Sequence, residues 1–216
     1  MLIEGTLRWR VTEDCPLDLL VALCLRDLAG LDGAGDPPLP EVIPTVQRLP
    51  VADRVLVMAP GAEHGRDDVR TPSALGEEWT RWWRRSVVRM NAVASWSTLF
   101  VPPHFPAFDR ELELQDLVIE RFQDAVAWAN ERRAEYLADD IGHHLEYSAD
   151  IVDIVRTREH ELRRQAGSFR LDIEALPLAE KGAWVVGPDT VVISWSLRDD
   201  HEAFRAWFAP LVAALV

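Results

Sequence analysis

The chain is poor in lysine and in cysteine. Of its 23 basic residues only Lys181 is a lysine, and its two cysteines are Cys15 and Cys24. They lie nine positions apart, without the CxxC spacing of a zinc ribbon or a redox pair. Both belong to the apolar run CPLDLLVALC, where cysteine usually behaves as a small buried hydrophobe. This usage predicts a reducing, cytoplasmic environment.

Several sequence signatures are also absent. No apolar run approaches the roughly 18 uninterrupted residues of a membrane span, and the start MLIEGTLRWRV lacks the cationic and apolar blocks of a signal peptide. The nucleophile motifs GxSxG and SxxK do not occur, nor do the phosphate-binding loops GxGxxG and GxxxxGK[ST]. We therefore expect no membrane association and no cofactor, while the presence of an enzymatic activity stays open.

What the sequence does contain is acid. The net charge is −13, and residues 101–150 hold twelve Asp and Glu against four Arg, a local balance of −8. With 48% apolar and 27% charged residues, the composition is that of a globular protein. A negative field repels phosphate backbones and anionic lipid, so the composition disfavours nucleic acid and membranes as partners.

The spacing of apolar residues predicts an α+β fold. Alternation over residues 3–11 and 169–175 predicts half-buried strands, and RVLVM at 54–58 predicts a buried one. The turn GPDT predicts a hairpin between strands at 183–186 and 191–197. We expect one domain over residues 1–216, with an antiparallel sheet whose residues 168–197 form a three-stranded meander, packed by helices on one face.

Helical periodicity predicts helices in five parts of the chain. They cover residues 15–28, 76–90, 110–138, 141–165 and a last helix that follows a capping box formed by Asp199 and Glu202. Residues 30–50, rich in Gly and Pro, predict an irregular connection. Because the two central helices are long and their join is short, we expect an antiparallel helical hairpin over residues 110–165.

The stretch GEEWTRWWRRSVVRM places Trp79, Trp82 and Trp83 on one side of a helix. A tryptophan stripe at this spacing predicts burial. Stacking on nucleobases would instead require the indoles and arginines to share an exposed face.

Arginines occupy the other side of this helix. Arg81, Arg85 and Arg89 follow one another at i, i+4 and i+8, which is mildly repulsive in isolation. Negative groups should therefore lie nearby. The acidic segment 109–140 is the simplest source, and a protein partner or a small anionic ligand is the alternative.

Two function classes remain. The first is a non-catalytic interaction or regulatory protein that binds a protein partner through an acidic helical surface. The residues of this surface are Glu113, Asp116, Glu120 and Asp124. The concentrated charge and the missing catalytic motifs favour this class.

The second class is a small metal-dependent hydrolase. In DDIGHHLEYSADIVD, His143, Glu146 and Asp150 fall on about one face of a helix, and His with carboxylates is a plausible ligand set for a divalent metal. No HExxH or DxDxDG motif accompanies them. His104 and the polar loop EHGRDD, residues 63–68, are weaker candidates that would gain weight if His64, His104 and His143 converged on one pocket.

Overall fold

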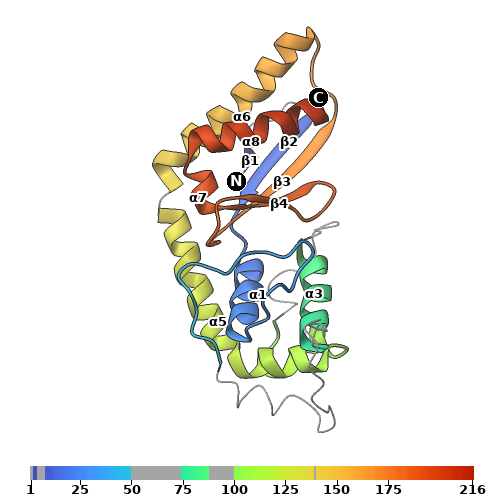
Figure 1. Cartoon of the computed structure of the whole chain (residues 1–216), viewed down its shortest axis with the longest axis vertical. Helices are drawn as coiled ribbons and strands as arrows, with labels where there is room; N and C mark the ends of the chain where they lie inside the picture. Colours follow the sequence, from blue (N-terminus) through green and yellow to red (C-terminus); the bar gives the residue numbers. More distant parts are fainter. Residues whose placement is uncertain (1, 4–7, 50–73, 88–99, 139) are drawn as a thin grey trace, which may run out of the picture. The chain divides into compact units, whose positions relative to one another are not determined.

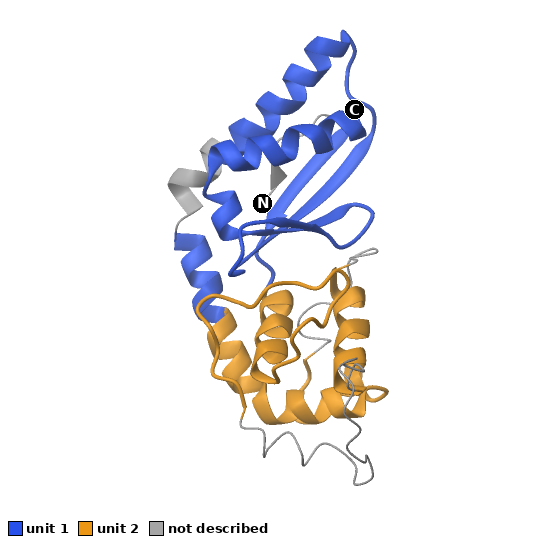
Figure 2. Ribbon diagram, viewed as in Figure 1, with its two compact units in different colours: residues 1–16, 130–216 blue, residues 17–129 orange. Residues whose placement is uncertain are grey.

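The computed structural model describes residues 2–3, 8–49, 74–87, 100–138 and 140–216, and for residues 2–3 and 140–146 it describes the backbone alone (Figure 1). The chain divides into two compact units (Figure 2). Unit 1 comprises residues 1–16 and 130–216, and unit 2 comprises residues 17–129. Unit 2 is thus inserted into the sequence of unit 1. The expectation of one domain over residues 1–216 stays a prediction.

Unit 1 contains a five-stranded mixed sheet with the strand order β1-β2-β3-β5-β4. Its strands are β1 (Leu2–Ile3), β2 (Trp9–Asp14), β3 (Phe169–Leu176), β4 (Ala183–Val185) and β5 (Thr190–Ser194). The central strands β2, β3 and β5 run parallel, whereas β1 and β4 pair antiparallel with their neighbours. The α+β class is therefore confirmed.

The predicted antiparallel meander is wrong. β4 and β5 do form the hairpin expected around GPDT, but β3 pairs with the other side of β5 and runs parallel to it. β4 therefore lies at the edge of the sheet, and β5 lies between β4 and β3. All five residues of β5 are buried, which fits its position between β3 and β4 inside the sheet.

Two helices of unit 1, α6 (Asp140–Leu162) and α8 (His201–Leu215), follow the predicted ranges closely, whereas α7 (Trp195–Arg198) falls where the sequence predicted the end of a strand. α6 packs against α8, and the short α7 packs against β3 and β5. β5 ends three residues earlier than predicted, because the hydroxyl of Ser194 accepts the backbone N–H of Leu197 and starts α7. Asp200, and not Asp199, caps α8 by accepting the N–H of Ala203 at 3.0 Å.

Unit 2 contains α1 (Leu17–Leu28), α3 (Ala74–Val87), a 3-10 turn (Pro106–Phe108) and the larger part of α5 (Leu112–Ala138). α5 continues into unit 1 at residue 130. The irregular connection predicted for residues 30–50 is confirmed over 30–49. The predicted strand at 54–58 lies outside the described residues. Pairing of the two central helices into a hairpin stays a prediction.

The core of unit 2 is aromatic. Trp79, Trp82 and Trp83 are 0%, 2% and 0% exposed, so the predicted burial of the tryptophan stripe is confirmed. Trp79 stacks on Trp83 with 5.3 Å between ring centroids, and its indole N–H donates to the carbonyl of Ala22 on α1 at 2.8 Å. Trp82 meets the ring of Phe108 edge to face. The hydrogen bond of Trp79 joins α3 to α1, and the contact of Trp82 joins α3 to the 3-10 turn.

Candidate functional site

The N-terminal half of α5 presents an exposed face that combines acidic and apolar side chains. Leu112 is 64% exposed and Ile119 is 50% exposed. Asp116, Glu120 and Asp124 are exposed beside them, and Glu113 is half-buried at the edge of the arc. At 100° per residue these positions span well under half of the helix circumference. We call this set, with Gln123, the acidic face: Leu112, Glu113, Asp116, Ile119, Glu120, Gln123 and Asp124.

The opposite side of α5 is buried and holds the acidic face in position. Its buried residues are Leu114, Leu117, Val118, Phe122, Ala125 and Ala129. The helix start is tied to α3, because Glu78 accepts the backbone N–H of Leu114 at 2.9 Å. Gln115 donates to the carbonyl of His104 at 2.8 Å and so anchors the preceding turn. The acidic face therefore rests on a helix fixed along its inner side.

The charge of this face is only slightly neutralised. Arg121 is the single basic residue between positions 111 and 131. It pairs with Glu120 at 2.7 Å and more loosely with Asp124 at 3.8 Å, and both carboxylates stay exposed. Glu113 and Asp116 form no ion pair with any other described residue. Four carboxylates against one guanidinium leave a field that attracts cations.

The arginines of α3 meet acids of their own unit. Arg85 donates through both terminal nitrogens to Oε1 of Glu111, each at 3.0 Å, and the acidic segment thus supplies the partner of one arginine. Arg84 pairs instead with Asp36, in the irregular segment before α3. Arg81 is exposed, and Arg89 lies outside the described residues.

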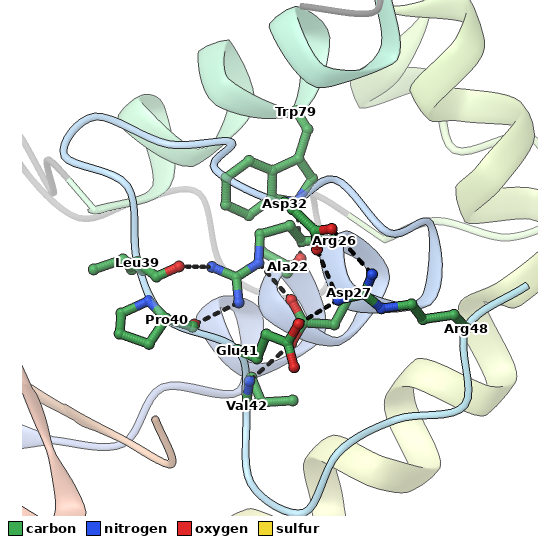
Figure 3. Close-up of polar contacts among 10 residues, drawn as sticks. All are labelled: Ala22, Arg26, Asp27, Asp32, Leu39, Pro40, Glu41, Val42, Arg48 and Trp79. Carbon is green, nitrogen blue, oxygen red and sulfur yellow. Dashed lines mark hydrogen bonds and ion pairs between the residues drawn. The ribbon is translucent and has the colours of Figure 1, made fainter. Parts of the chain in front are cut away.

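A buried ion pair fastens the irregular segment 30–49 to α1 (Figure 3). Arg26, 2% exposed, binds Asp27 and donates to the carbonyls of Leu39 and Pro40 at 3.0 and 2.7 Å. Asp27 in turn accepts the backbone N–H of Val42 at 2.7 Å. All the polar atoms named here are paired within unit 2, so we assign this pair a structural role.

A second buried polar cluster lies in unit 1 and was not anticipated from the sequence. The guanidinium of Arg198, at the end of α7, binds Glu13 of β2 and lies over the rings of Tyr136 and Tyr147, 4.9 and 4.7 Å from their centroids. Tyr136 also donates to Glu13 at 3.1 Å. Burial raises the pKa of Tyr147 to about 12. At 3% exposure, neither Glu13 nor Arg198 is accessible to a solute, so we assign the cluster a structural role.

The sequence carried one signal for this cluster. Glu13 follows Trp9 and Val11 at the alternate positions of β2 whose side chains point into the core. A buried carboxylate is costly unless a cation pairs with it, so Glu13 predicts a buried basic partner. Its partner follows 185 positions later, where no local pattern marks it.

Only part of the proposed metal set lies among the described side chains. Asp150 does, and both of its oxygens are engaged: Oδ2 by Nδ1 of His201 at 2.7 Å and Oδ1 by Arg205. A metal there would have to displace a guanidinium. The side chains of His143 and Glu146 fall outside the described part, and no group of three or more potential ligands occurs within it. The metal-dependent hydrolase stays a prediction.

The two cysteines are buried, and the histidine candidates are described only in part. Cys15 and Cys24 are 1% exposed, and burial raises the pKa of the Cys24 thiol to about 12 and that of Cys15 still higher, so both thiols stay protonated at neutral pH. His104 is exposed. His64, Asp67 and Asp68 lie outside the described residues, so their convergence with His104 and His143 is untested.

Comparison with known proteins adds no relative. No protein-family model matches the chain, and neither curated proteins nor solved structures give a match. Of the helices in the described ranges, none combines the length and apolar character needed to cross a membrane.

Proposed function

We propose that the protein is a non-catalytic interaction or regulatory factor that binds a basic protein partner through the acidic face of α5. One observation carries this proposal. Leu112 and Ile119, 64% and 50% exposed, lie on the same side of the helix as Asp116 and Glu120. A purely solvated acidic helix face has no need of two large aliphatic side chains in water.

The two kinds of side chain serve different parts of binding. Covering Leu112 and Ile119 would contribute on the order of 1–2 kcal/mol each, since each is already partly covered. The carboxylates around them would speed association with a basic surface and disfavour acidic competitors. An apolar centre with a charged rim is the usual anatomy of a protein interface.

Charge reversal within the acidic face tests the proposal. The double variant Asp116→Lys/Glu120→Lys is compared with Glu180→Lys/Asp189→Lys, which changes the net charge of the chain equally at two exposed positions of unit 1. Tagged wild type and both variants are used for affinity capture from a lysate of the source cells, with quantitative mass spectrometry. We expect at least one basic protein to be captured by the wild type and the control variant and lost from the α5 variant.

Truncation provides the second arm. Alanine at Glu113, Asp116, Glu120 and Asp124 removes the charge without adding cations and should reduce capture of the same protein. If wild type and both α5 variants capture the same proteins in the same amounts, this surface does not bind the partner and the proposal is wrong.

A further inference from the structure

Three aliphatic residues of α5 follow one another at intervals of seven. Leu112 and Ile119 are seven positions apart, and Val126, half-buried, follows after seven more. Seven residues make nearly two helical turns, about 10.5 Å along the axis. The three side chains therefore form a line along the helix rather than an isolated patch.

This spacing suits a helix better than an extended segment. In a partner helix with a heptad pattern, apolar side chains recur at the same 10.5 Å interval and can contact each member of the line. In an extended strand, side chains on one face recur about every 6.8 Å, so the two series would fall out of step. Between the apolar positions, Asp116 and Gln123 continue a 4–3–4 spacing, which is that of a coiled-coil seam.

The charges decide against a second copy of this chain as the occupant. Glu113 and Glu120 flank the apolar line on one side, and Asp116 lies within the seam. Two acidic faces placed together would bring carboxylates opposite carboxylates, in parallel or antiparallel orientation. Lysine or arginine in the flanking heptad positions of a partner would instead pair with them.

We propose that the partner docks on α5 as a basic amphipathic α-helix, with heptad-spaced apolar residues on Leu112, Ile119 and Val126 and with cationic residues against Asp116, Glu113 and Glu120. This inference rests on the proposed function of the acidic face and adds the secondary structure, spacing and charge of the segment it binds.

The probes are three labelled synthetic peptides of three heptads each, built from leucine, lysine, alanine and glutamine. The first places leucine at the heptad seam positions and lysine beside them. The second has the same composition, but its leucines stand at every second position, which is the alternation of an extended strand. The third is the first with one central proline, which breaks a helix. Binding to the full chain is measured by fluorescence anisotropy at physiological ionic strength.

We expect the heptad peptide to bind at least about tenfold more tightly than the other two. The variant Leu112→Ser/Ile119→Ser should lose about tenfold or more in affinity for the heptad peptide alone. Val185→Ser, which removes a 65% exposed apolar side chain of β4, is the matched control and should leave binding unchanged.

The outcomes separate the two proposals. If all three peptides bind equally and Asp116→Lys/Glu120→Lys weakens all of them, the acidic face attracts cations but the helical partner is wrong. If the heptad peptide binds as tightly to Leu112→Ser/Ile119→Ser as to the wild type, the apolar line is not the contact and the inference is overturned. If no peptide binds while the lysate capture still depends on Asp116 and Glu120, the face functions with a partner of another shape.

Discussion

Arg198 and Glu13 form an ion pair in which the two side chains are only 3% and 4% exposed. They come from opposite ends of the sequence, and the pair joins α7 to β2 within unit 1. The guanidinium also lies over the rings of Tyr136 and Tyr147, so removal of Arg198 would leave the carboxylate of Glu13 buried without its cation. The stability of unit 1 should depend strongly on this pair.

Replacing Arg198 with methionine should lower the free energy of unfolding by about 3–5 kcal/mol, because it leaves the buried carboxylate of Glu13 without its cation. Urea denaturation followed by circular dichroism measures this loss. Lys181→Met is the control, since Lys181 and Asp200 are 48% and 40% exposed and a surface pair of this kind contributes little to stability. Similar losses in both variants would contradict the structural role of the buried pair.

Trp79→Ala should destabilise unit 2 by about 3–5 kcal/mol, because it leaves a cavity in place of a fully buried indole and removes the hydrogen bond to the carbonyl of Ala22. Thermal unfolding monitored by circular dichroism provides the measurement. Arg81→Ala on the exposed side of the same helix should change stability by no more than about 0.5 kcal/mol. An equal effect of the two substitutions would mean that the stripe is not the inner side of α3.

Substitution of Arg85 should cost more stability than substitution of its neighbour Arg84. Glu111, the partner of Arg85, is 7% exposed, whereas Asp36, the partner of Arg84, is 64% exposed. Arg85→Ala leaves a buried carboxylate with fewer donors and should cost about 1–2 kcal/mol. Arg84→Ala breaks a surface pair and should cost less than about 0.5 kcal/mol. Urea denaturation of the two single variants, side by side, tests this order, and the reverse order would refute it.

The contact of α6 with α8 should weaken in acid. Burial raises the pKa of Asp150, but hydrogen bonds from His201 and Arg205 outweigh it and hold the pKa below its ordinary value of 3.8. A carboxyl whose pKa is lower in the folded state stabilises that state above its unfolded pKa, and it loses this contribution as pH falls through the folded pKa.

Asp150→Asn should therefore destabilise the protein at pH 6, and the difference from the wild type should shrink below about pH 4. Unfolding free energies of both proteins, measured from neutral pH down into the acid range below the ordinary carboxyl pKa, check this sign. Asp189→Asn, at an exposed turn position, controls for the loss of one charge. A difference that stays constant with pH would show that Asp150 acts here only through packing.

Features that depend on local spacing could be predicted from the sequence. Trp79, Trp82 and Trp83 segregate from the arginines at helical intervals, and the structure buries them. The long helices α5 and α6 begin and end within a few residues of the predicted positions. The exposure of Asp116, Glu120 and Asp124 also follows from the apolar period of α5, although no local pattern indicated that Leu112 and Ile119 would remain exposed beside them.

The tertiary structure alone decided which strands pair and which charges meet. The sequence predicted β4 between β3 and β5 in an antiparallel meander. In the structure β4 lies at the edge of the sheet, and β3 pairs directly with β5 in parallel. Glu13 and Arg198 stand 185 positions apart. The physical reason is the range of the interactions: helical periodicity and capping act between residues a few positions apart, whereas strand order and buried ion pairs arise when distant segments are brought together during folding.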